Sequence, residues 1–232
     1  MILGCRVDRV DTAGARARII ELLDSGRPAQ VVTLGAEMVM HAQRDAAYRE
    51  IVNSADLVVP DTIGIVWASR RIGEPLHERV AGIDLVERLL DETDLPVFML
   101  GAEDGVATRA ADALASRHAR MRIAGVHHGY FSDADSTAVA AEIGRSGARL
   151  VLVALGFPRQ EFWIKENLGA LGNAVCIGVG GAFDVWAGAV QRAPAFTRRL
   201  GLEWLYRLVT QPNRLGRQLA LPAFAFRVLM GQ

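Results

Sequence analysis

The sequence predicts an α/β fold with a doubly wound, mostly parallel, Rossmann-like sheet. Short apolar runs alternate with longer segments of helical spacing along most of the chain. The runs are apolar throughout, which is typical of parallel strands that helices cover on both faces. Nearly every run ends in a glycine-rich or polar loop. In a parallel sheet these loops meet at one edge, so a single long cleft is expected there.

Each expected strand is a short run rich in Val, Ile and Leu. The strands are residues 2–7, 30–33, 57–59, 96–100, 122–126, 150–155 and 174–179. The expected helices have apolar residues at helical spacing, and the first is capped by Asp11 and Thr12 and closed by Gly26. They span residues 12–23, 37–51, 63–71, 84–90, 106–116, 138–146 and 160–168, followed by 197–209 and 214–219 in the tail.

Composition points to one large α/β domain with an appendage. The chain has 232 residues, 51% of them hydrophobic, and no formal net charge. Residues 192–232, however, hold seven arginines and a single acid, Glu203, so this segment carries +6 and residues 1–191 carry −6. We therefore expect a catalytic domain at 1–191 and a basic appendage at 192–232 with its own anionic partner.

The sequence favours a cytoplasmic protein. Cys5 and Cys176 have neither metal-ligand spacing nor a paired pattern, which fits a reducing compartment. No run approaches the roughly 20 apolar residues that span a bilayer.

Asp61 is the acid best placed for chemistry. It follows a β-branched run that ends at Pro60, and Gly64 comes shortly after it. This places Asp61 on a loop at the carboxyl end of a strand, where open α/β sheets bind their ligands. The alternative is an Asp that only caps the helix beginning near Ile63, because Asp is a preferred N-cap residue.

The glycine-rich loops exclude some nucleotide-binding classes and favour a phosphate site. Residues 101–105 precede a helix, so backbone N–H groups and the helix dipole could receive a phosphate there. No GxxxxGK[ST] pattern occurs, which argues against a P-loop ATPase. Residues 178–182 resemble a dinucleotide loop but lack the following strand with its acid, which disfavours a dehydrogenase.

His127 and His128 are adjacent on a strand, where successive side chains point to opposite faces, so they make a poor metal site. Ordinary polar positions are therefore favoured over metal ligands for the two histidines.

Arg79, Gln160 and Arg192 lie in short segments dense in polar residues, at 78–84, 158–161 and 191–194. An Arg fork suits a pyrophosphate because it offers paired donors and a permanent charge. The alternative is a set of solvated loops with local salt bridges.

These segments, in this order, resemble the WecG/TagA/CpsF family of bacterial glycosyltransferases. The resemblance covers nearly the whole chain, from residue 4 to about 217. Its most informative blocks are residues 60–64, 78–84, 128–131, 155–161, 178–188, 192–194 and 201–207. It implies transfer of a sugar (N-acetylmannosamine, its uronic acid, glucose or glucuronic acid) from a UDP-sugar to a polyprenyl-pyrophosphate-linked saccharide at the inner face of the cytoplasmic membrane.

The resemblance also implies roles for individual residues. Asp61 would be the general base of an inverting transfer, assisted by Thr33, and no metal or other cofactor is expected. The expected substrate-binding residues are Gly35, Thr62, Gly64, Arg79, Gly82, Asp84, Gly101, Gly105, Gly156, Gln160, Glu161, Gly181, Asp184, Arg192, Arg207 and Arg214. Two positions depart from the family pattern, because Gly35 replaces a common Asn and Thr62 a common Gly.

In the resembling family the C-terminal appendage completes the active site and associates with membranes. Here it combines arginines with Leu200, Trp204, Leu205 and Phe224, which suits an anionic membrane surface. The alternative is a docking helix pair with Trp204 in the core.

A rival function for the whole chain is a non-catalytic UDP-sugar sensor or scaffold of a polysaccharide assembly complex. Nucleic-acid binding is disfavoured because no recognised motif is present, and self-association stays open.

Overall fold

The structure is a computed structural model that describes residues 1–194, 196–197, 203, 205–206 and 220–231. Its centre is a six-stranded, all-parallel sheet with the strand order β2-β1-β6-β5-β3-β4. The strands are β1 (Ala29–Leu34), β2 (Leu57–Pro60), β3 (Pro96–Gly101), β4 (Arg122–His127), β5 (Leu150–Ala154) and β6 (Val175–Gly178). The predicted fold class is confirmed.

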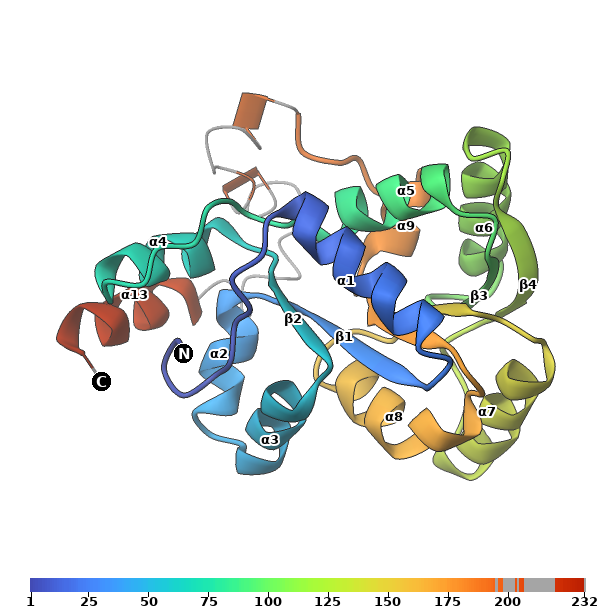
Figure 1. The fold of residues 1–232 in the computed structure, drawn as a ribbon, viewed down its shortest axis with the longest axis horizontal. Helices are drawn as coiled ribbons and strands as arrows, with labels where there is room; N and C mark the ends of the chain where they lie inside the picture. Colours follow the sequence, from blue (N-terminus) through green and yellow to red (C-terminus); the bar gives the residue numbers. More distant parts are fainter. Residues whose placement is uncertain (195, 198–202, 204, 207–219, 232) are drawn as a thin grey trace.

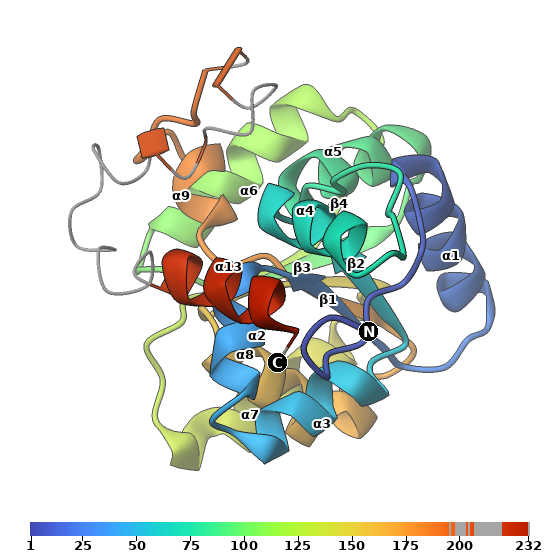
Figure 2. The same cartoon turned by 90° about the vertical axis from the view of Figure 1, so that its left-hand side faces the viewer.

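Helices cover both faces of the sheet (Figures 1 and 2). One face carries α1 (Thr12–Asp24), α5 (Gly82–Glu92), α6 (Val106–Arg117) and α9 (Ala182–Trp186). The other carries α2 (Ala36–Ala42), α3 (Ala46–Ser54), α7 (Ser136–Arg145) and α8 (Arg159–Asn167). Two short 3-10 turns, Asp133–Asp135 and Leu168–Ala170, complete the second layer.

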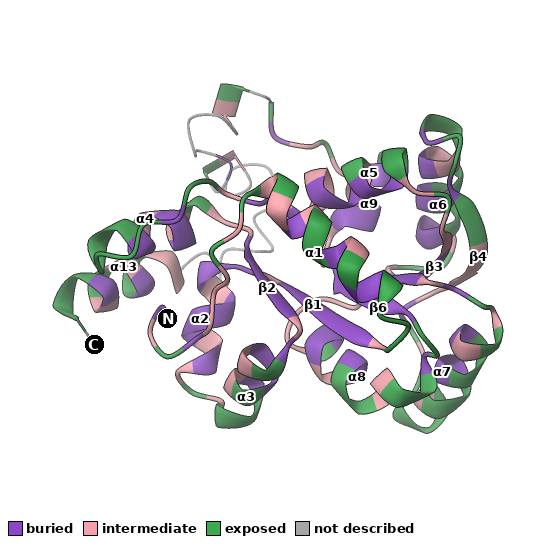
Figure 3. Ribbon diagram, in the orientation of Figure 1, coloured by how far each residue is buried: buried purple, intermediate pink, exposed green. Residues whose placement is uncertain are grey.

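Successive residues of a strand point to opposite faces of the sheet, and each face packs against its own helical layer to form a hydrophobic core. In β1, Val31 packs on the α1 side and Val32 on the α2 side, and both are buried. This two-sided burial explains why the strands read as unbroken apolar runs. Figure 3 shows the inner strands buried, whereas β4 at the sheet edge is partly exposed along its length.

The predicted strand at residues 2–7 is wrong. The segment forms a single antiparallel bridge between Ile2 and Cys5, because Leu3 and Gly4 turn the chain with positive φ angles of 45° and 77°. Further on, the N–H of Asp8 donates to the Val58 carbonyl at 2.9 Å, and the Asp8 carboxylate accepts from the Val58 N–H at 2.8 Å. These two bonds cover the outer edge of β2.

The predicted helix at residues 37–51 is two helices. α2 ends at Ala42, and the Asp45 side chain caps α3 by accepting a hydrogen bond from the Tyr48 N–H at 2.9 Å. An Asp at this position favours a new helix start over continuation, because its side chain satisfies an N–H that the first turn leaves open. The two helices form part of the covering layer under β1.

Most of the tail predictions at 197–209 and 214–219 lie outside the described residues. A helix that the sequence analysis did not predict, α13 (Ala220–Met230), packs beside α2 and α4 (Ile63–Arg71) (Figure 2). Phe224 and Val228 of α13 are buried in the core that contains Ile65 of α4. Phe224 was expected at a membrane surface, and this placement is wrong because its ring fills that core.

Among the described residues, no helix combines the length and apolar character needed to cross a membrane.

Candidate active site

The carboxyl ends of β1, β2 and β6 surround a small cavity of about 70 Å³. β1 continues into α2 on one face of the sheet, whereas the adjacent β6 continues into α9 on the other. Such a reversal opens a crevice in which α/β proteins bind ligands. The lining residues are Thr33, Asp61, Arg79, Ala81, Gly82, Ile83, Val179, Gly181, Ala182, Arg192 and Glu203. The structure thus brings together six residues that the sequence analysis selected: Thr33, Asp61, Arg79, Gly82, Gly181 and Arg192.

Asp61 is held by both its backbone and its side chain. Its carboxylate Oδ1 accepts a hydrogen bond from the Gly82 N–H at 2.7 Å, and its carbonyl accepts one from Arg79 Nε at 2.7 Å. Gly82 is the first residue of α5, so the carboxylate faces the positive end of that helix. The residue before α4 is Thr62, which makes no side-chain cap. Asp61 therefore does not cap the helix at Ile63, and it faces the cavity from a fixed position.

Thr33 stands opposite on β1. Its hydroxyl donates to the Gly178 carbonyl at 2.8 Å, which ties the ends of β1 and β6 together. A Cβ atom at Gly82 would lie 3.0 Å from Thr33 Cγ2 and 3.7 Å from Asp61 Oδ1. A glycine at this position therefore lets α5 approach close enough for its first N–H to reach Asp61.

Two arginines bring positive charge to the cavity, and both are paired. Arg79 Nη2 lies 2.8 Å from Glu203 Oε2, and Arg192 Nη2 lies 2.7 Å from Asp84 Oδ1. Burial alone would lower the pKa of Arg79, but the carboxylates of Asp61 and Glu203 outweigh it and raise the pKa above its ordinary value. Arg79 is therefore a permanent cation in a partly buried, acid-lined site.

Glu203 and Arg192 come from the C-terminal segment and contribute to the wall of the cavity. The sequence analysis named Glu203 as the single acid among seven arginines and included it in the block 201–207 that resembles the family, but did not select it as a site residue. It also missed Ala81, Ile83, Val179 and Ala182, whose small or apolar side chains carry no chemical signature.

The model of the glycosyl transferase WecG/TagA/CpsF family matches residues 1–232. The chain belongs to this family. A relative from Bacillus spizizenii is 40% identical over 210 residues, covering 89% of this chain and 81% of the relative. Relatives from Bacillus subtilis (37% over 210 residues, with the same coverage) and Staphylococcus aureus (37% over 201 residues, 85% and 78%) are also similar. All three are named N-acetylglucosaminyldiphosphoundecaprenol N-acetyl-beta-D-mannosaminyltransferase.

In this glycosyltransferase chain Gln160 and Glu161 do not line the cavity. Both are buried, with 3% and 1% of their surface exposed. Gln160 Nε2 donates to Glu161 Oε1 at 2.7 Å, and Gln160 Oε1 accepts from the Gly180 N–H at 3.1 Å. Through the hydrogen bond to Gly180, they support the cavity wall from the interior of the protein.

Other expected binding residues lie around the cavity without lining it. Gly35 adjoins the Glu37 carboxylate, and Gly64 lies between Ala36 and Phe224, next to Thr62. Asp184 is in the first turn of α9. Arg207 and Arg214, like Arg198, Arg199 and Arg217, lie outside the described residues.

Gly101, Gly105 and Gly156 lie outside the cavity lining, at the end of β3 and in the loops that follow β3 and β5. β3 continues into α6 and β5 into α8, on opposite faces of the sheet. Gly105 has a φ of 73° and immediately precedes α6. Gly105 makes no side-chain cap at the start of α6, and the phosphate site expected at residues 101–105 stays a prediction.

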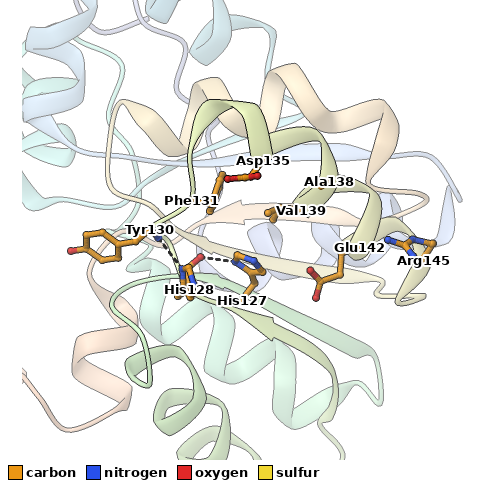
Figure 4. Close-up of a pocket in the computed structure, with 9 residues that line it drawn as sticks. All are labelled: His127, His128, Tyr130, Phe131, Asp135, Ala138, Val139, Glu142 and Arg145. Atoms are coloured by element: carbon orange, nitrogen blue, oxygen red, sulfur yellow. Dashed lines mark hydrogen bonds between the residues drawn. The ribbon is translucent and has the colours of Figure 1, made fainter.

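A larger cavity of about 580 Å³ lies at the opposite side of the sheet, between β4 and α7 (Figure 4). His127 and His128 line it, and His127 Nδ1 bonds to the His128 carbonyl at 2.7 Å. None of the expected site residues is there. The described residues include no group of three or more His, Cys, Asp or Glu able to hold a metal ion. The two imidazoles lie on the same cavity, with ring centroids 4.8 Å apart.

Proposed function

We propose that this chain is an inverting glycosyltransferase that moves N-acetylmannosamine from a UDP donor to a polyprenyl-diphosphate-linked N-acetylglucosamine in cell-wall polymer synthesis. The observation that carries the proposal is Asp61, fixed at the α5 N-terminus and flanked by Arg79 in the cavity. The relatives' names support the sugar and the acceptor.

The reaction is a single displacement. The acceptor hydroxyl oxygen attacks C1 of the donor sugar as Asp61 takes its proton, and the bond from C1 to the phosphate oxygen breaks. UDP leaves with that bonding pair. Attack opposite the leaving group inverts the anomeric carbon. Arg79 and Arg192 supply the positive charge that stabilises the departing diphosphate, so the proposal requires no metal.

Donor binding changes the pairing of these arginines. Arg79 is matched by Glu203 and Arg192 by Asp84 in this structure. A diphosphate oxygen offers each guanidinium an alternative acceptor of comparable geometry. We propose that the donor replaces the two carboxylates as partner of the arginines, which places its diphosphate beside the guanidinium groups of Arg79 and Arg192.

The test is UDP release from four donors that carry N-acetylmannosamine, its uronic acid, glucose or glucuronic acid. Each is assayed with a short-chain polyprenyl-diphosphate N-acetylglucosamine or glucose acceptor. We expect acceptor-dependent release with the N-acetylmannosamine donor at least about tenfold above the others, the ratio that 1.4 kcal/mol of selectivity gives. UDP binding without release for any pair would instead favour the UDP-sugar sensor.

We also propose that the chain works at the membrane surface, where its lipid-linked acceptor lies. α13 exposes Phe226, Leu229 and Met230, with 62%, 60% and 56% of their surface accessible, and Arg227 lies on the same helix. Apolar side chains beside a cation suit the interface of an anionic bilayer.

Replacing Phe226 and Leu229 together by Ser is expected to lower binding to anionic liposomes by about tenfold or more, since each side chain contributes about 1 kcal/mol or more of apolar burial. The readout is co-sedimentation at low salt. Ile123→Ser, at an exposed position on β4 (40% accessible), is the control and should bind as wild type does. If the double variant binds liposomes as well as wild type does, α13 is excluded as the element that contacts the membrane.

A further inference from the structure

Two consecutive hydrogen bonds connect the interior of the protein with the wall of the candidate active site. They begin at Glu161 on α8, pass through the Gln160 amide, and end at the Gly180 N–H. Val179 and Gly181, on either side of Gly180, line the cavity. Glu161 is too deeply buried to touch a ligand, and the Gln160 amide connects it by hydrogen bonds to the wall of the cavity.

The packing leaves the Gln160 amide little freedom. A Cβ atom at Gly178 would lie 2.6 Å from Gln160 Nε2 and 3.2 Å from Glu161 Oε1, so the amide lies against the Gly178 backbone. The Gly178 carbonyl on this segment accepts the hydrogen bond from Thr33. The same short segment therefore meets the Gln160 amide on one side and a cavity-lining hydroxyl on the other.

The charge on Glu161 decides how strongly the amide is oriented. A carboxylate only accepts hydrogen bonds, so Gln160 must present Nε2 to it and is left with Oε1 for the Gly180 N–H. A bond to an ionised acceptor is about twice as strong as one between neutral groups. Loss of the charge would therefore loosen the contact that holds Gly180.

We propose that Glu161 is a positioning residue whose ionised carboxylate orients Gln160 and thereby fixes the Gly178–Gly181 wall of the cavity for the diphosphate of the donor. The part that concerns the donor rests on the proposed function. The part that concerns the wall stands on the contacts alone.

The titration of Glu161 falls near neutral pH. Burial raises its pKa to about 7, against the lowering effect of the hydrogen bond from Gln160 and of the neighbouring Tyr48 hydroxyl. The backbone carbonyl of Glu161 accepts from Gln30 Nε2 on β1. Further out, Glu37, His41 and Cys5 surround Tyr48. As pH rises through about 7 the carboxyl ionises, so the wall is fixed above this pH and loosened below it.

The experiment follows the Gly180 amide signal by NMR in ¹⁵N-glycine-labelled protein without ligand, from pH 5.5 to 8.5. In wild type the signal should move with one midpoint near 7, the value that burial gives Glu161. In E161Q, which keeps the shape and an acceptor oxygen, the shift should disappear. In Y48F the midpoint should rise, because the Tyr48 hydroxyl lowers the pKa of Glu161.

Two controls separate Glu161 from other charges. E166Q makes the same change at an exposed position of the same helix and should titrate as wild type does. H41Q removes the neighbouring imidazole and should also leave the midpoint unchanged. An unchanged titration in E161Q, or its loss in H41Q, would overturn the proposal.

Calorimetric measurement of UDP binding at pH 8 tests whether Glu161 affects donor binding. The dissociation constant of E161Q should exceed that of E166Q by about fivefold, consistent with one weakened charge-assisted contact. If the Gly180 titration behaves as expected but neither protein binds UDP, the proposed function fails while the positioning of the wall stands. Equal UDP affinity in the two variants would overturn the link from Glu161 to donor binding.

Discussion

Asp61→Asn is expected to lower acceptor-dependent sugar transfer by about 10²–10⁴-fold while leaving UDP binding within about threefold of wild type. Asn cannot take the proton of the acceptor hydroxyl. Its side-chain oxygen can still accept the 2.7 Å bond from the Gly82 N–H, so the start of α5 and the cavity should keep their shape. The measurements are UDP release for the rate and calorimetry for the affinity.

Asp84→Asn is the matched control, because it removes the same charge from the rim of the site. Asp84 pairs with Arg192 at 2.7 Å and does not line the cavity. Because the donor displaces Asp84 from Arg192 in the proposed complex, loss of the Asp84 charge should change the rate by about tenfold or less and should not raise the donor KM. Equal losses of rate in the two variants would mean that Asp61 acts only through its charge. A variant of Asp61 that transfers sugar at the wild-type rate would exclude it as the base.

Six of the seven expected strands and the position of Asp61 were predictable because their causes are local. An apolar run buried on both faces has a simple signature, and Pro60 ends β2 at a defined residue. The same holds for the gathering of Thr33 with Asp61, since adjacent parallel strands bring their carboxyl ends together.

The pairing of Arg79 with Glu203 was not predictable, because 124 residues separate them and only the tertiary fold brings them together. The burial of Gln160 and Glu161 was hidden for a different reason. Polar residues are normally exposed, and only mutual hydrogen bonding makes an interior position tolerable for them. The helix α13 lacks a polar face of the usual width, so its pattern gave no amphipathic signal.

Gly101→Ala is expected to lower the free energy of unfolding by about 3–5 kcal/mol. Gly101 ends β3 with a φ of 131°, a backbone conformation that an L side chain rarely adopts. An added Cβ would lie 2.4 Å from the Ala154 carbonyl oxygen and 2.8 Å from its Cα, both backbone atoms of the adjacent β5. Relief requires the ends of two central strands to separate. Urea unfolding, followed by circular dichroism, measures the change.

Gly26→Ala distinguishes the steric clash from the backbone strain. Gly26 also has a positive φ, 65°, but an added Cβ would meet no atom within 4 Å. Its cost should be about 1–2 kcal/mol, the usual penalty of an alanine in the left-handed region. The difference between the variants then reports the close approach of β3 and β5. Equal costs would show that β5 moves aside without loss, and that Gly101 is required there for its backbone conformation alone.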